Sequence, residues 1–175
     1  MDNSINRGAG FVQEVWLPAH TILPFINIGV LVTEGWTEIN AILKNEITFV
    51  GQSPTGGTVQ MGILDGKPGI SPMQLLLVAV AGCTGEDIVS ILKKKRLKPT
   101  DMQVRVRGKR ATNYPMVWTD IHITYLIWGE NLPPKDVEQT INLSEEKYCS
   151  VGIMLGKAAR ITSEYQLLKP VENAE

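Results

Sequence analysis

The chain has 175 residues, the size of one compact domain, and its 43% hydrophobic and 20% charged residues predict a globular fold with a substantial core. The net charge of -1 gives no electrostatic reason to expect a nucleic-acid or anionic-membrane partner. Two cysteines are too few for a secreted disulfide scaffold and no secretory signal is recognisable. We therefore expect a cytoplasmic protein without a permanent disulfide.

Residues 1–35 differ from the rest because they show neither strand alternation nor a helical period. Glycines and prolines interrupt this stretch at Gly8, Gly10, Pro18, Pro24 and Gly29. We interpret it either as an arm that docks on a partner subunit or as a segment that is not part of the natural product. Residues 36–175 are predicted to form the folded domain.

Short strands separated by turns are predicted from Trp36 to Met61. The segment Ser53–Gly57 is a clear turn between two of these strands, Ile47–Val50 and Thr58–Met61. A loop follows, which contains the strong turn dipeptide Asp65-Gly66.

The strongest predicted helix begins at Ser71, a good N-cap, with Pro72 at the first helical position. The residues that follow are apolar on every side except at Gln74, which is typical of a buried helix. The helix carries Cys83 and ends in the basic run Lys93–Arg96. We interpret this run as charge at a helix C-terminus rather than as a phosphate site.

Alternation of apolar and polar residues predicts two further strands, Gln103–Arg107 and Ile121–Ile127. Pro133-Pro134 then opens a helix, and Cys149-Ser150 begins a shorter one before a last strand over residues 159–167. One face of the first of these helices is shared by Val137, Ile141, Ser144 and Tyr148. Antiparallel strands with helices packed over them predict an α+β fold.

The two cysteines are the candidate reactive residues. By itself, Cys83 on an apolar helix is most simply a small core residue, because free cysteine is among the most buried residue types. Cys149 lies at a helix start, where backbone N–H groups are expected to lower its pKa. One cysteine on a buried helix and one at a helix start suit a nucleophile and its resolving partner.

Two parts of the sequence resemble motifs of the OsmC/Ohr family. Ser71–Leu77, leading into Gly82-Cys83-Thr84, is similar to the central-helix motif of the family, and so is Ile91–Arg96. Farther along, Leu143–Val151 resembles the motif that holds the second cysteine. The resemblance covers roughly Trp36 to Leu168.

This resemblance implies an OsmC-like fold, with antiparallel sheets packed on a long central helix, in an intertwined homodimer with a thiol-peroxidase site at the subunit interface. By the same resemblance, Cys83 attacks an organic hydroperoxide and becomes a sulfenic acid. Cys149 then condenses with it to a disulfide, which a dithiol reduces. No cofactor is implied. The alternative is a non-catalytic stress protein on the same fold that binds a small hydrophobic ligand.

The chain departs from the family pattern at the groups that activate the first cysteine. Family peroxidases carry an arginine on an N-terminal strand, whereas this chain has no arginine between Gly8 and Lys95. Met73 stands where the family has the glutamate that orients this arginine. A fast thiol needs another cation, and the candidates are Arg7, Lys44, Arg105, Arg107 and Arg160.

Glu86 and Asp87 follow Cys83 at the spacing that places them on its helical face. Their negative charges would raise the pKa of the thiol unless they hold a relocated arginine, and the alternative is that they form a solvated face. Together with the cysteines, His20 and His122 do not show the spacing of a zinc motif, so we expect no metal site. On its alternating strand, His122 is expected to face solvent.

Overall fold

The computed structural model describes residues 35–170. The chain divides into two units, Met1–Glu38 and Ile39–Glu175, and every helix and strand described here lies in the second. The predicted N-terminal arm therefore lies outside the described residues, apart from Gly35.

Short strands and tight turns form the first part of the described chain, as predicted. Three of the strands make an antiparallel sheet in the order β1-β2-β3, and two more pair as a small ribbon. Their bounds are β1 Asn40–Asn45, β2 Thr48–Gln52, β3 Thr58–Met61, β4 Ile63–Leu64 and β5 Lys67–Pro68. The predicted loop around Asp65-Gly66 is the hairpin turn of this ribbon, and both of these residues have positive φ, as a two-residue hairpin requires.

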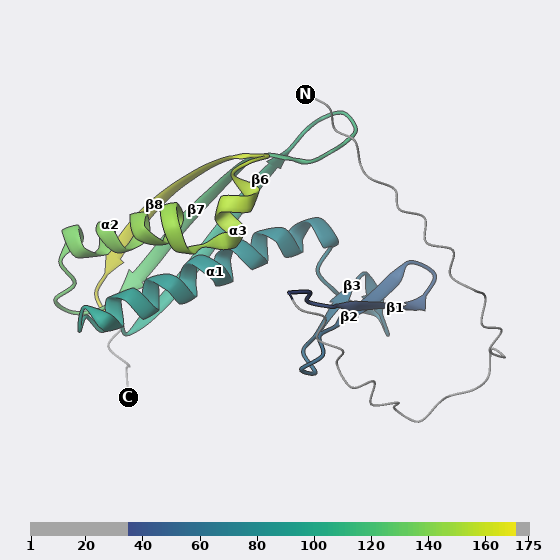
Figure 1. Cartoon of the computed structure of the whole chain (residues 1–175), viewed down its shortest axis with the longest axis horizontal. Helices are drawn as coiled ribbons and strands as arrows, with labels where there is room; N and C mark the ends of the chain where they lie inside the picture. The colour runs from purple at the N-terminus through teal and green to yellow at the C-terminus, as the bar shows by residue number, and fades with distance from the viewer. Residues whose placement is uncertain (1–34, 171–175) are drawn as a thin grey trace. The chain divides into compact units, whose positions relative to one another are not determined.

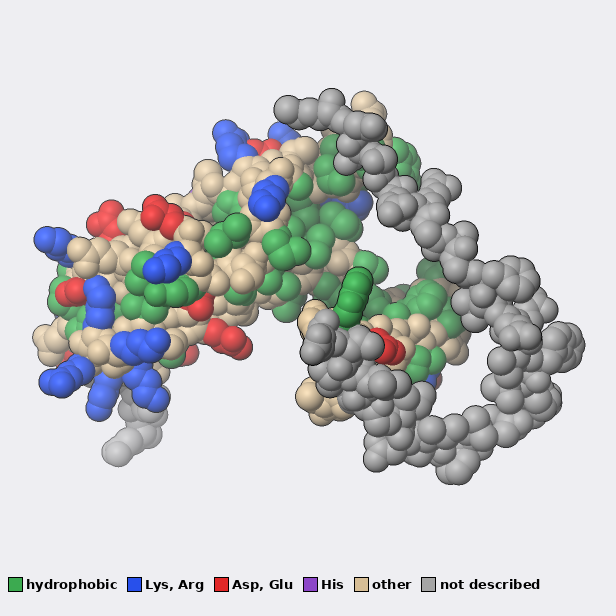
Figure 2. All heavy atoms as spheres, viewed as in Figure 1, with side chains coloured by type: hydrophobic (Ala, Val, Ile, Leu, Met, Phe, Trp, Pro, Cys, Tyr) green, Lys and Arg blue, Asp and Glu red, His purple; other side chains and the backbone are tan. Residues whose placement is uncertain are grey.

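Helix α1 (Pro72–Lys94) begins where the sequence predicts. The Ser71 hydroxyl accepts a hydrogen bond from the Gln74 N–H, and the Gln74 side chain accepts one from the Ser71 N–H. This reciprocal pair satisfies N–H groups that have no partner inside the helix. The basic end is also as predicted, and Figure 2 shows Lys and Arg side chains gathered where α1 ends. There Lys95 forms an ion pair with Asp136, at 2.8 Å.

The second sheet has the order β6-β7-β8 and is mixed, so the prediction of antiparallel sheets is wrong for one pair of strands. β6 (Asp101–Arg110) runs antiparallel to β7 (Trp118–Trp128), whereas β8 (Arg160–Leu168) runs parallel to β7. The reason is the long connection between β7 and β8, which carries the chain back to the end of the sheet where β7 begins. This crossover holds α2 (Pro134–Leu143), a π-helical turn η1 (Ser144–Tyr148) and α3 (Ser150–Leu155).

The core lies between the helices and one face of this sheet. In Figure 1, α1 and α2 run side by side along β6–β8, and buried side chains from all of these layers form one cluster. It includes Val80, Ile88 and Leu92 of α1, Ile121, Ile123, Tyr125 and Ile127 of β7, and Val137 and Ile141 of α2. These residues include the inward faces predicted from the alternation of β7 and the helical period of α2.

Within this chain α1 is buried along one side only, so the expectation of a helix buried all round is not met. Leu76, Val78 and Val89 are 38%, 51% and 41% exposed. Figure 2 shows hydrophobic side chains at the surface over the N-terminal half of α1. Among residues 35–170, α1 is also the one helix long and apolar enough to cross a membrane, a test that the core helix of a globular protein passes as well.

Candidate functional site

The two cysteines meet although they are far apart in sequence. Cys83 lies on α1 and Cys149 is the N-cap of α3. Their sulfur atoms and a carboxylate oxygen of Asp87 all lie within 4.8 Å of one another. Both thiols are free, Cys83 is partly exposed and Cys149 is fully buried. The site thus joins one partly exposed cysteine and one fully buried cysteine.

A π-helical turn turns Cys149 inward. Of the four residues predicted to share a face, Val137, Ile141 and Ser144 are buried, but Tyr148 is 47% exposed. The Cys149 N–H donates to the Ser144 carbonyl at 2.8 Å, five residues back instead of four. Because the turn contains one extra residue, the side chain that points into the core is that of Cys149 and not that of Tyr148.

The buried sulfur is held by the first turn of α3. The Gly152 N–H donates to Cys149 Sγ at 3.2 Å. A Cβ atom at Gly152 would also lie 3.2 Å from this sulfur, closer than such contacts normally are. Glycine at this position therefore allows the backbone to approach the thiol.

The pKa of Cys149 is raised, mainly by burial, then by its hydrogen bond with Cys83, and also by the charge of Asp87. The prediction that a helix start lowers this pKa is wrong, because the single hydrogen bond from Gly152 is outweighed. Asp87 is itself fixed, since the Ser144 hydroxyl donates to Asp87 Oδ2 at 3.0 Å.

The structure separates the two predicted acidic residues. Asp87 joins the sulfur cluster. Glu86 is exposed and lines a different hollow, an apolar groove of about 550 Å³ between α1 and β6, together with Val89, Met102 and Val104. Glu86 and Asp87 were predicted to lie on the same helical face, but they belong to different sites.

None of the proposed cations is hydrogen-bonded to either thiol or to Asp87 among the residues that the structure describes. Arg105 bonds to Gln103, and Arg160 is paired with Asp120 at 2.7 Å. Arg107 alternates with the inward-facing Val106 of β6 and so points to the face of the sheet away from α1. Lys44 lies on β1, and Arg7 is outside the described residues.

One lysine for which the sequence gives no signal shares a pocket with Cys149. A pocket of about 520 Å³ is lined by Cys149, Lys157 and Arg160 and by the apolar side chains of Val80, Ile153 and Ile161. Lys157 follows the short helix α3, whose position against the first cysteine could not be read from the sequence. It is the lysine that shares a pocket with the buried thiol.

A buried tyrosine and a glutamate were also missed as part of the site. The Tyr125 hydroxyl donates to Glu145 Oε1 at 2.9 Å, and the Ser163 hydroxyl donates to Oε2 at 3.1 Å. Burial and the Glu145 charge raise the pKa of Tyr125. Strand alternation identifies Tyr125 as an inward residue, but no sequence signal identifies Glu145 as its partner.

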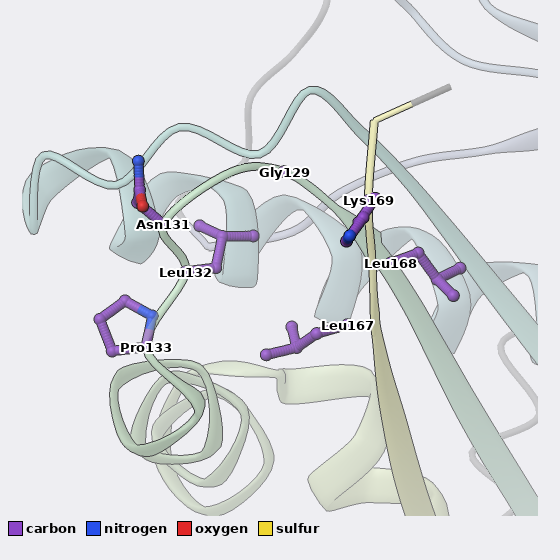
Figure 3. A pocket seen from close by; sticks show the side chains of 7 residues that line it. All are labelled: Gly129, Asn131, Leu132, Pro133, Leu167, Leu168 and Lys169. Carbon is purple, nitrogen blue, oxygen red and sulfur yellow. The ribbon is translucent and has the colours of Figure 1, made fainter. Parts of the chain in front are cut away.

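Other features lie away from the thiols. His122 is on the face of β7 opposite the helices, where it hydrogen-bonds Thr162 at 2.8 Å. A separate hollow of about 450 Å³ lies at the end of the sheet. Figure 3 shows Leu132 and Leu167 pointing into it. This hollow is lined by seven residues and contains no nucleophilic thiol.

Two free thiols lie close together between the helices of an α+β domain. The sequence contains no nucleotide-binding loop. These features place the chain among small thiol-bearing proteins. The sequence profile of the family described as OsmC-like protein matches residues 64–164. The chain belongs to the OsmC family, as its motifs predicted.

The relatives support this assignment. Protein YhfA of Escherichia coli (strain K12) is 37% identical over 122 residues, which are 70% of this chain and 91% of YhfA. The crystal structure of a hypothetical protein from Aquifex aeolicus VF5 aligns with a TM-score of 0.69 and 32% identity, over 77% of this chain and 98% of that one. The organic hydroperoxide resistance protein OhrB of Bacillus subtilis shares the fold, with a TM-score of 0.53 and 14% identity, over 75% of this chain and 98% of OhrB.

Proposed function

We propose that this chain is a thiol-dependent peroxidase that reduces organic hydroperoxides with Cys83 and Cys149. The observation that carries the proposal is the meeting of the two sulfurs within 4.8 Å, one partly exposed and one buried. A side-chain rotation brings such a pair to the disulfide bond length of about 2.05 Å. The name of the similar fold in Bacillus subtilis supports hydroperoxides as the substrate class.

The different burial of the two residues supports our order for the reaction. The thiolate of Cys83, the partly exposed residue, attacks the outer oxygen of the hydroperoxide, so that Cys83 becomes a sulfenic acid and the alkoxide takes a proton to leave as an alcohol. The Cys149 thiol then attacks the Cys83 sulfur, and water leaves as the disulfide forms. A dithiol reduces this disulfide and is itself oxidised, which restores both thiols.

The cation for the second step, in which Cys149 attacks Cys83, is assigned to Lys157. Negative charge from Asp87 contributes to the raised pKa of Cys149, so without help this thiol would form its thiolate slowly. Lys157 lines the pocket that reaches Cys149, and its flexible side chain can approach a developing anion there. Replacing Lys157 by Met keeps most of the apolar stem and removes the charge.

The active form is proposed to be a homodimer joined along α1. The exposed side of this helix is apolar at Val78 and Val89, and a monomer rarely leaves such a surface uncovered. Gly82 lies on the same exposed side, and a Cβ atom there would meet nothing within 4 Å. A glycine in mid-helix is unfavourable alone but suits close approach of a second chain.

Peroxide consumption by the reduced protein tests the proposed function. Purified protein with dithiothreitol is expected to consume cumene hydroperoxide, and Cys83→Ser and Cys149→Ser are each expected to abolish turnover. Stoichiometric peroxide without reductant should lower the intact mass of the wild type by two hydrogen atoms. Glu86→Gln is the matched control and should keep both results. Absence of turnover and of the mass change in the wild type would contradict the proposal.

A second candidate function is the binding of a small hydrophobic ligand, and one observation favours it. The groove of Val89, Met102 and Val104 has about 550 Å³, the size of many small-molecule pockets. Binding of a hydrophobic fluorescent probe that is lost in Met102→Glu and kept in Cys83→Ser would support it. A protein of this kind would show no peroxide turnover. We expect a cytoplasmic location for either function, since both cysteines are free.

A further inference from the structure

The sulfur cluster has the composition of a metal site. Cys83 and Asp87 lie one helical turn apart on α1, and Cys149 faces them from the N-cap of α3. One ligand atom from each lies within 4.8 Å of the other two. The spacing of histidines and cysteines predicts no metal site, but the fold brings a carboxylate beside both sulfurs.

We propose that the reduced protein binds one soft divalent cation, Zn²⁺, through Cys83 Sγ, Cys149 Sγ and a carboxylate oxygen of Asp87. This site rests on geometry within one chain and not on peroxidase activity. Tetrahedral zinc with Zn–S bonds of about 2.3 Å holds its ligand atoms about 3.5 to 3.8 Å apart. The three ligand atoms lie within 4.8 Å of one another, and small side-chain movements would bring them to this separation.

Hydrogen bonds around the cluster orient two of its ligands. Ser144, which is fully buried, donates its hydroxyl to Asp87 Oδ2 at 3.0 Å and leaves the other carboxylate oxygen for an ion. The Gly152 N–H donates to Cys149 Sγ at 3.2 Å and favours the thiolate form of that ligand. Metal ligands in proteins are commonly held by outer groups of this kind.

The charges at the site also favour a cation. Two thiols share the site with a carboxylate, and among residues 35–170 no lysine or arginine is hydrogen-bonded to any of the three groups. A divalent ion reverses the effect of burial and negative neighbours, since a coordinating thiol gives up its proton. Binding therefore releases two protons as both sulfurs coordinate, and affinity is expected to rise with pH.

Ion binding and disulfide formation use the same electron pairs on sulfur, so they exclude each other. When a hydroperoxide accepts two electrons and two protons to give an alcohol and water, the two sulfurs join and the ion is released. With three protein ligands, the fourth position of the ion is left to water or to a small ligand.

Cobalt binding by the reduced, metal-free protein tests this site without any peroxide. Under anaerobic conditions, Co²⁺ is expected to give an intense sulfur-to-metal absorption band that saturates at one ion per chain, and Zn²⁺ should displace it. Cys83→Ser, Cys149→Ser and Asp87→Asn should each weaken binding by at least about tenfold, and Ser144→Ala by about tenfold or more. Glu86→Gln, one position away from Asp87 and outside the cluster, should bind as the wild type does.

Two results would overturn the proposal. One is the absence of the cobalt band when both thiols are shown to be reduced. The other is a band that Asp87→Asn leaves unchanged, which would mean that the carboxylate is no ligand. Circular dichroism of each variant confirms that it is folded. Since peroxide is never added, failure here leaves the peroxidase result untouched, and peroxidase failure leaves this result untouched.

Discussion

Removal of the Asp87 charge is expected to make Cys149 more acidic. The carboxylate oxygen lies within 4.8 Å of the sulfur, and its charge is one cause of the raised pKa of this thiol. Two unit charges at this distance repel by about 3.5 kcal/mol at an effective dielectric constant near 20 and by about 0.9 kcal/mol in bulk water. About 1.4 kcal/mol corresponds to one pKa unit. Because the charge of Asp87 is the smallest cause of the raised pKa, the lower energy applies, and Asp87→Asn should lower the pKa of Cys149 by about half a unit to one unit.

The assay isolates the buried thiol. In a Cys83→Ser background Cys149 is the one remaining cysteine of the chain, and its thiolate is followed by ultraviolet absorbance against pH. Subtracting the titration of the double cysteine variant removes the tyrosine signal, and a chelator keeps metal away. Glu86→Gln removes an equal charge from the next position and should change nothing. A Cys149 pKa that Asp87→Asn leaves unchanged, or that Glu86→Gln lowers equally, would refute the electrostatic reasoning.

Three further predictions concern stability and assembly. Because the folded protein holds Cys149 protonated, its unfolding free energy should fall as pH rises from about 8.5 towards the raised pKa. The loss should reach about 1.4 kcal/mol at about pH 9.5. Urea titrations at several pH values measure this decrease, and Cys149→Ala should remove it. Tyr125→Phe should cost about 1 to 2 kcal/mol of unfolding free energy by removing a buried hydrogen bond, whereas Tyr114→Phe, at an 88% exposed position, should cost almost nothing. Gly82→Ala should stabilise an isolated helix by about 0.5 to 1 kcal/mol but weaken a dimer joined along α1, and sedimentation at falling concentration distinguishes these outcomes.

Local signals allowed much of the fold to be predicted from the sequence. Ser71 and Pro72 marked the start of α1, and alternation marked the inward residues of β7. The parallel pairing of β8 with β7 was missed because strand direction is set by the path of the chain between them, which no local pattern records.

Motifs identified both cysteines, but the surroundings of the thiols could not be predicted. Periodicity assigned the inward position after Ser144 to Tyr148, since a regular helical period cannot anticipate a wide turn. The pKa of Cys149 was expected to be low because only the helix start was visible in the sequence, and burial is a property of the folded chain. Lys157 was missed for the same reason, since it reaches the pocket only through tertiary contacts.

Because η1 contains one extra residue, the number of residues from Ser144 to Tyr148 decides whether the Cys149 sulfur points towards α1. If one residue between Ser144 and Tyr148 were deleted, the segment could continue as a regular helix and the side chains after it would rotate by about 100°. A relative that is one residue shorter here is therefore expected to present a different side chain to α1, even where its cysteine aligns. Insertions and deletions in this turn are thus a more informative guide to which family members retain the pair than substitutions around it.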